Sequence, residues 1–282
     1  MLSIWEAVWM AILQGLTEFL PISSSGHLAI LGNVLRINTD GGALLEVVLH
    51  VGTLISIILI YYKDVWTLIR EAVMLIVDGI RYLKNREEHP FRMYPERRMT
   101  LYVILASIPT AIIGLMVQKF LEDIFLSSLI AVGAALLVTA LLLYASKGIK
   151  PGTKTLEEAS IRDILTIGVV QGFATIPGIS RSGSTIVTEM AAGFDPKLTV
   201  RFSFLISLPA VAGAALLSFI KADKSLVAVN AVSYLIGILV AAVVGYICLR
   251  FMVRILQKGK LYYFSYYCAV IGFFAIIMGF IL

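Results

Sequence analysis

Charge is scarce in this chain, and the scarcity argues against a soluble fold. Only 15% of its 282 residues are Asp, Glu, Lys or Arg, whereas a soluble domain carries about a quarter. The two cysteines, Cys248 and Cys268, lie far apart in apolar stretches, so neither a disulfide scaffold nor a cysteine metal site is expected. No basic residue precedes the first apolar stretch, so a cleaved signal peptide is not expected either.

Apolar residues make up 59% of the chain, and the mean hydropathy is +0.93. Six apolar stretches approach or exceed the length of about 20 residues that crosses a bilayer. They are residues 44–62, 100–118, 126–145, 201–220, 226–249 and 262–281. The basic residues lie between these stretches and not on one soluble domain, so nucleic acid is not expected as a partner. The sequence therefore predicts a single all-α polytopic membrane domain, residues 1–282, in contact with membrane lipids.

Two further apolar stretches are interrupted and are not typical of ordinary spans. Residues 4–31 contain Glu18, Pro21 and three successive serines, and residues 164–193 contain Arg181 among hydroxyls and glycines. Broken backbone at membrane depth is tolerated only inside protein or beside a water-filled cavity. We therefore predict two re-entrant helix–loop–helix hairpins in addition to six transmembrane helices.

The two hairpins also resemble each other, which indicates an internal repeat. Residues 14–26 and 171–183 align without a gap and share Gln14/Gln171, Gly15/Gly172, Ile22/Ile179, Ser23/Ser180, Ser25/Ser182 and Gly26/Gly183. The halves 1–145 and 146–282 then each hold one hairpin and three spans. Because three spans end on the opposite side of the membrane, the second copy is expected to be inverted relative to the first.

The basic residues predict the orientation of the spans. The loops placed in the cytoplasm hold 18 Lys and Arg, and they are residues 63–99, 146–163, 194–201 and 250–260. The basic residues on the opposite side are Arg36, Lys119, Lys221 and Lys224. By the positive-inside rule, both termini and the opening of the site are expected to be extracytoplasmic. The long loop 63–99 is expected to form solvated helix ends and a connector.

The first hairpin concentrates groups that are costly inside a membrane. Gln14 and Glu18 are one helical turn apart and share a face, and Pro21 ends that helix. The serines and glycine of residues 23–26 then form a turn that brings His27 back. A buried ionisable group favours a functional site. The alternative is a neutral or hydrogen-bonded Glu18 with serines that only cap helix ends.

The second hairpin offers one arginine, Arg181, among hydroxyls and glycines at the start of a helix. A guanidinium forms paired bonds to phosphate oxygens, and the N–H groups of a helix N-terminus add positive potential. The alternative is an Arg181 that pairs with Glu18 as a structural lock. The spacing is not that of a P-loop.

Together these residues predict a site for a phosphorylated substrate. Arg181 would bind the anion, Ser24 or water would attack, and His27 and Glu18 would move protons. The residues expected to bind substrate are Gln14, Ser23, Ser25, Ser180, Ser182, Gly183 and Thr185. Glu18 is also the expected ligand of a divalent cation, Mg²⁺ or Ca²⁺, and no organic cofactor is expected.

The segments Gln14-Gly-Leu-Thr-Glu-Phe-Leu-Pro-Ile-Ser-Ser-Ser-Gly-His27 and Pro177-Gly-Ile-Ser-Arg-Ser-Gly-Ser-Thr185 resemble the two signature motifs of the undecaprenyl-diphosphate phosphatases, the bacterial bacitracin-resistance proteins. That family's first motif begins with Glu or Gln, and Gln14 takes the amide option. The resemblance covers the whole chain in length, motif order and span pattern. It implies a bacterial inner-membrane enzyme that hydrolyses a polyprenyl diphosphate lipid to its monophosphate, which recycles the carrier lipid for peptidoglycan synthesis.

A secondary transporter is the competing hypothesis, because inverted repeats with broken helices are also a transporter architecture. A transporter needs an anion site but no nucleophile–base pair, so Ser24 and His27 favour the enzyme. A flippase for the same lipid stays open. The sequence also leaves open whether Ser24, His27 or water attacks, and whether the chain forms a homo-oligomer.

Overall fold

The computed structural model describes residues 2–34, 42–85, 93–222, 224–257 and 260–281, and these ranges are almost entirely helical. Arg36, Arg86, Arg92 and Lys258, which contribute to the charge asymmetry, lie outside the described residues. The fold class predicted from the sequence, an all-α polytopic membrane protein, is confirmed.

Both interrupted stretches fold as pairs of short helices joined by a turn. The first pair is α1 (Ile4–Phe19) and α2 (Ser24–Val34), and the second is α8 (Ile161–Phe173) and α9 (Arg181–Ala191). Helix α1 stops directly before Pro21, whose ring cannot continue a helix. The chain then reverses at Ser23, which has a φ of 68°, a conformation that is rare outside glycine. Helix α9 begins after Ser180, whose side chain caps it by accepting from the N–H of Gly183.

The longer helices coincide with the predicted spans. They are α3 (Gly42–Ile60), α5 (Pro95–Phe120), α7 (Leu129–Ala145), α10 (Pro196–Lys221), α11 (Lys224–Gln257) and α12 (Tyr263–Ile281). Within the described ranges, five of them are long and apolar enough to cross a membrane alone, and α3 would make a sixth together with α4 (Tyr62–Asn85) beyond a 93° bend. The short α6 (Glu122–Ser127) and the 3₁₀ turn η2 (Ser146–Gly148) flank α7.

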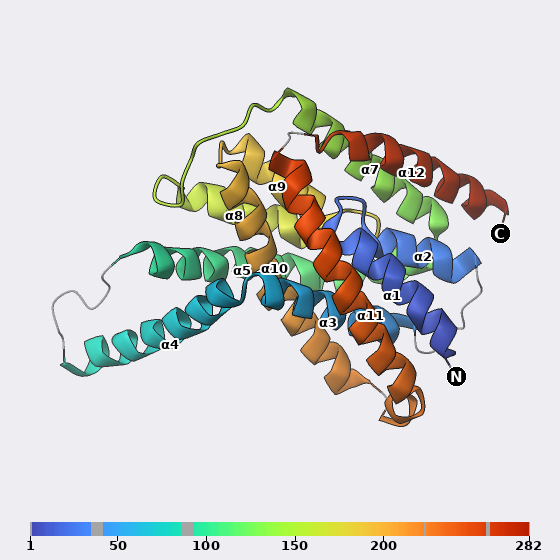
Figure 1. Cartoon of the computed structure of the whole chain (residues 1–282), viewed down its shortest axis with the longest axis horizontal. Coiled ribbons are helices and arrows are strands. Elements are labelled where there is room, and N and C mark those ends of the chain that lie inside the picture. Colours follow the sequence, from blue (N-terminus) through green and yellow to red (C-terminus); the bar gives the residue numbers. More distant parts are fainter. Residues whose placement is uncertain (1, 35–41, 86–92, 223, 258–259, 282) are drawn as a thin grey trace.

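The stretch 63–99 is more ordered than the expected solvated connector. Its first part is α4, which runs beside α5 and away from the remaining helices (Figure 1). Arg97 at the start of α5 is buried between two acids of α4, with its Nη2 2.8 Å from Asp78 Oδ2 and its Nε 3.5 Å from Glu71 Oε2. The pairing of charges between α4 and α5 could not be predicted from the sequence, because it depends on how these two helices pack against each other.

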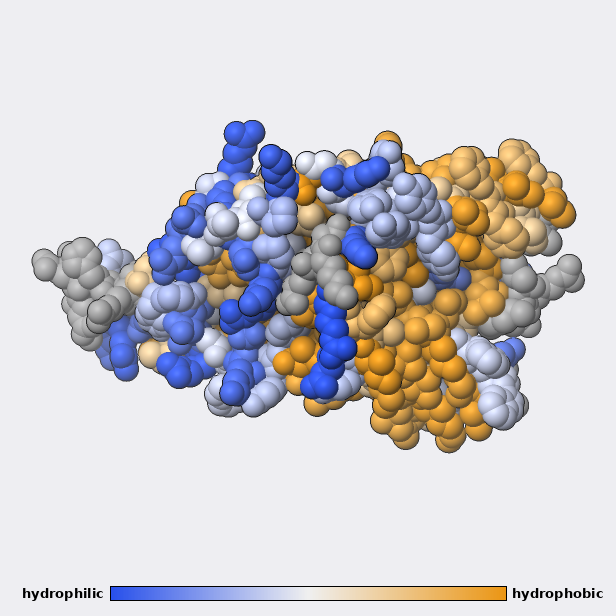
Figure 2. Space-filling model, turned by 45° about the horizontal axis from the view of Figure 1, so that its top comes forward, coloured by the Kyte–Doolittle hydropathy of each residue, from blue (hydrophilic) through white to orange (hydrophobic). Residues whose placement is uncertain are grey.

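Helix packing links the two halves of the chain. Helix α1 packs along α11, α8 packs along α5, and α7 packs along α12 (Figure 1). Exchange of the halves converts the first pairing into the second, as a repeat requires, although the inverted repeat itself stays a prediction. Figure 2 shows hydrophilic residues gathered over one half of the molecule and a broad apolar surface over the other. Such a surface suits contact with lipid chains.

Candidate active site

The tips of the two hairpins touch, which brings the two sequence motifs together. A Cβ at Gly26 would lie only 3.1 Å from Gly178 Cα, so the approach is tight enough to favour glycine. Gly178 has a φ of +97°, and a Cβ there would lie 2.6 Å from the carbonyl oxygen of Val132. Thr139 on α7 holds the second tip, because its hydroxyl donates to Gly178 O at 2.9 Å and accepts from Ser180 N at 3.0 Å.

The carboxylate of Glu18 lies at the centre of the site. Its Oε2 accepts a hydrogen bond from Ser24 Oγ at 2.6 Å and another from Gln14 Nε2 at 3.1 Å. Its Oε1 pairs with Nη2 of Arg181. The Glu18 side chain is only 5% exposed, so these contacts compensate a charge that is otherwise nearly removed from water. A serine from α2 and an arginine from α9 are thus held on the two oxygens of one carboxylate.

His50 on α3 also lies at the site, although it was not among the site residues predicted from the sequence. Its Nε2 lies 3.4 Å from Glu18 Oε2, and its side chain is 23% exposed. Its Nδ1 donates to the backbone oxygen of Glu46 at 2.8 Å, which directs Nε2 toward Glu18. A lone histidine inside an apolar stretch was the available signal, by the same cost argument that singled out Glu18.

His27 lies at the first tip, but it does not contact Ser24. Its Nδ1 lies 2.7 Å from the backbone oxygen of Ser23, and its Nε2 lies 2.9 Å from the hydroxyl of Tyr267. Both ring nitrogens are therefore engaged. The expected pairing of His27 with Ser24 is not formed in this arrangement, because the turn directs the imidazole toward Ser23 and α12. The acceptor that the Ser24 hydroxyl contacts is Glu18.

Arg181 has one nitrogen without a hydrogen-bond partner among the described residues. Its Nη2 pairs with Glu18, so the lock that was the alternative interpretation of this arginine is present. Its Nη1, however, is buried and has no hydrogen-bond partner among the described residues. A buried donor left unpaired costs about 1–3 kcal/mol, and more for a charged group. An oxyanion in the adjoining cavity would remove that cost.

The catalytic cavity beside these residues has a volume of about 680 Å³, which is within the usual range for small-molecule sites. The hairpin tips and α3 supply most of its polar lining, whereas α5 and α10 line it mainly with apolar side chains. Among the expected site residues, those that line it are Glu18, Ser23, Ser24, Ser25, Ser180 and Arg181. A cavity with one polar and one apolar side suits an amphiphilic ligand.

The remaining expected residues do not line the cavity but contact the segments that do. They are Gln14, His27, Ser182, Gly183 and Thr185. The Gly183 N–H is used by the cap of α9, at 3.1 Å from Ser180 Oγ. Thr185 bonds to the backbone oxygen of Arg181 at 3.0 Å and to the hydroxyl of Ser203 on α10. These contacts hold the first turn of α9, and with it Arg181, in place.

A resident metal ion at Glu18 fits this arrangement poorly. Both of its carboxylate oxygens already have partners, and one partner is a guanidinium. In the described part of the chain, no group of three acidic, histidine or cysteine side chains could hold a metal ion. A second carboxylate does line the cavity, that of Glu46. The Glu46 carboxylate could contribute to metal binding only if the ion enters the cavity together with a ligand that supplies further oxygen atoms.

Comparison with known proteins gives a consistent result over the whole chain. Residues 7–274 match the family described as bacitracin resistance protein BacA. The undecaprenyl-diphosphatase of Halothermothrix orenii is 40% identical over 279 residues, which are 99% of each chain. That of Methanosphaera stadtmanae is 38% identical over 285 residues, 100% of each chain. That of Bacteroides thetaiotaomicron is 37% identical over 276 residues, 96% of this chain and 97% of its own.

Proposed function

Because the chain belongs to the bacitracin resistance protein BacA family, we propose that it hydrolyses undecaprenyl diphosphate to undecaprenyl phosphate and phosphate. The reaction would return the carrier lipid to peptidoglycan synthesis. The observation that carries the proposal is the position of Glu18, which holds a hydroxyl, Ser24, and a phosphate-binding cation, Arg181, beside one cavity. Phosphoryl transfer needs a positioned attacking oxygen and a cation that stabilises the charge on the phosphate, and these two residues can supply them.

Arg181 binds the terminal phosphate in this mechanism. Its unpaired Nη1 supplies a donor, and a guanidinium matches phosphate oxygens geometrically. The N-cap residue Ser180 lines the same cavity, so the positive end of α9 adds to the attraction.

Ser24 is the nucleophile. Its Oγ attacks the terminal phosphorus while its proton passes to Glu18 Oε2, 2.6 Å away. The bond between that phosphorus and the bridging oxygen breaks, and the electron pair leaves with undecaprenyl phosphate. Water then attacks the phosphoserine, Glu18 returns its proton to Ser24 Oγ, and phosphate is released with one proton given up to solvent.

The two histidines have different duties in this account. His50 faces Glu18 and the cavity, and with its Nδ1 bound to Glu46 O the doubly protonated ring is placed to donate from Nε2 to a phosphate oxygen of the bound lipid. His27 is a positioning residue, because its bond to Ser23 O stabilises the turn that presents Ser24. Tyr267 ties the same imidazole to α12.

A divalent cation, Mg²⁺ or Ca²⁺, is proposed only for the complex with substrate. An ion carried in by diphosphate oxygens would meet the carboxylate of Glu46 in the cavity wall, and oxygen ligands suit both ions. Its chemistry would be to neutralise charge on the transferred phosphate.

We also propose that the chain lies in the bacterial inner membrane with both termini and the opening of the catalytic cavity outside the cytoplasm. The excess of Lys and Arg in the loops 63–99, 146–163, 194–201 and 250–260 supports this orientation.

Phosphate release by the purified protein in detergent tests the proposed activity, because no gradient exists there to drive transport. The wild-type chain should release phosphate from undecaprenyl diphosphate, and Ser24→Ala should not. Ser107→Ala is a matched control, since Ser107 bonds to Val103 O on α5 and does not line the cavity. Failure of the wild-type chain to release phosphate would support the transporter hypothesis instead.

A further inference from the structure

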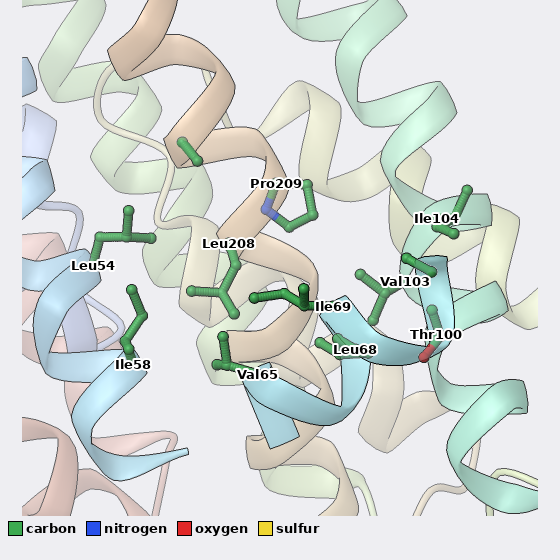
Figure 3. Close-up of a pocket in the computed structure, with 12 residues that line it drawn as sticks. Leu54, Ile58, Val65, Leu68, Ile69, Thr100, Val103, Ile104, Leu208 and Pro209 are labelled. Carbon is green, nitrogen blue, oxygen red and sulfur yellow. The ribbon is translucent and has the colours of Figure 1, made fainter. Parts of the chain in front are cut away.

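A second cavity of about 320 Å³ lies between α3, α4, α5 and α10 (Figure 3). Leu54 on α3 and Leu208 on α10 face one another across it, and Leu68 and Ile69 of α4 close it from the side of the 93° bend. Among the described residues that line it, only Thr100 carries a polar side chain. This apolar cavity offers shape and dispersion contacts but almost nothing that would bind a polar group.

The apolar cavity continues the catalytic cavity along the same three helices. On α3, His50 lines the catalytic cavity and Leu54, about one turn later, lines the apolar one. On α5, Thr110 lines the catalytic cavity and Ile104 lines the apolar one. On α10, Pro209 lines both. The two cavities are therefore lined by neighbouring segments of the same three helices, and they share Pro209.

We propose that the apolar cavity binds part of the isoprenoid tail of the lipid diphosphate, an inference that rests on the proposed function. The diphosphate is held by Arg181, in the cavity that Pro209 also lines, so the tail needs an apolar path that begins near this proline. The apolar cavity is such a path. Membrane lipid is as apolar as the cavity wall. The cavity therefore contributes to binding of the tail through close packing and not through removal of the tail from water. Close packing discriminates between tails, and the cavity therefore sets a preference for long chains.

Filling the apolar cavity tests the proposal. Ala212 lines it from α10, and Ala212→Trp would occupy the space that the tail needs. The kinetics of the purified variant are measured with undecaprenyl diphosphate and with farnesyl diphosphate, whose short tail does not need the second cavity. We expect KM for the long substrate to rise about tenfold or more, as a filled apolar subsite predicts. KM and kcat for the short substrate should stay near the wild-type values.

Two further variants make the outcome decisive. Ala134→Trp, on the exposed face of α7, adds the same bulk away from the cavity, and it should leave KM and kcat unchanged for both substrates. Ala72→Trp fills the apolar cavity from α4 and replaces Ala212→Trp if that variant does not fold. Equal changes for both substrates, or no change for either, would overturn the proposal. Absence of hydrolysis of both substrates by the wild-type chain would instead overturn the proposed function.

Discussion

The Ser24 hydroxyl donates a 2.6 Å hydrogen bond to Oε2 of Glu18. The two residues come from different helices, and the turn through Pro21 and Ser23 folds one onto the other. The same carboxylate pairs with Arg181 from the second hairpin. One buried acid therefore connects the group that attacks with the group that binds phosphate, and the contact between the hairpin tips makes this possible.

Replacing Glu18 by glutamine keeps the shape of the side chain but removes the proton acceptor of Ser24. We expect kcat to fall by about 10²–10⁴-fold, the usual contribution of a general base. Phosphate release by purified Glu18→Gln measures the effect. Glu157 is an exposed loop residue, so Glu157→Gln is the control and should keep the wild-type kcat. A Glu18→Gln variant with near-normal kcat would remove Glu18 from the chemistry.

Lysine at position 181 keeps the charge of arginine but cannot bind Glu18 and a phosphate oxygen through two nitrogens of one planar group. Arg181→Lys should therefore raise KM and lower kcat together, with kcat/KM reduced about 100-fold or more. Arg162→Lys, on the exposed side of α8, serves as the matched control. Unchanged kinetics in Arg181→Lys would leave the arginine as a structural lock only.

Much of this arrangement was predictable from the sequence. Long apolar stretches predicted the spans, and the polar breaks within residues 4–31 and 164–193 predicted the two hairpins, because local chemistry decides where a helix ends. Pairing between Glu18 and Arg181 was one of the alternatives that the residues left open, and it is present. These features depend on residue type and spacing alone.

The roles of the histidines were not predictable in the same way. His50 reaches Glu18 only because α3 docks beside the first hairpin, which is a property of packing and not of spacing. His27 turns away from Ser24 because of the unusual backbone at Ser23 and the position of Tyr267 on a helix 240 residues away in the chain. The apolar surroundings of His50 mark it as unusual in the sequence, but neither its contact with Glu18 nor the orientation of His27 can be read from local spacing.

The two histidines should respond differently to substitution. His50→Ala removes a donor to the bound phosphate, so KM should rise several-fold, in the range of about 3–10-fold, with kcat largely kept. His27→Ala and Tyr267→Phe act on the same turn, and both should lower kcat with KM little changed. Steady-state kinetics of the three variants separate these effects. If Tyr267→Phe has no effect while His27→Ala is as inactive as Glu18→Gln, His27 is a catalytic base and not a positioning residue.

The contact between the hairpin tips predicts a cost for a methyl group at Gly178. Alanine there would hold an unfavourable positive φ and meet the Val132 carbonyl oxygen, so we expect a loss of about 1–3 kcal/mol in stability. A lower melting temperature of Gly178→Ala in detergent would show it. Gly148→Ala is the control, because no atom lies within 4 Å of a Cβ built at Gly148. Equal melting temperatures for the two variants would contradict the described tip geometry.

The covalent intermediate is the most direct test of the proposed mechanism. Undecaprenyl diphosphate labelled in its terminal phosphate is mixed with the purified enzyme, the reaction is quenched within one turnover, and the labelled peptide is mapped. The mechanism predicts a label on Ser24, reduced accumulation in Glu18→Gln, and none in Ser24→Ala, which should also lack turnover. A label on His27, or an unlabelled chain whose Ser24→Ala variant still turns over, would contradict nucleophilic attack by Ser24.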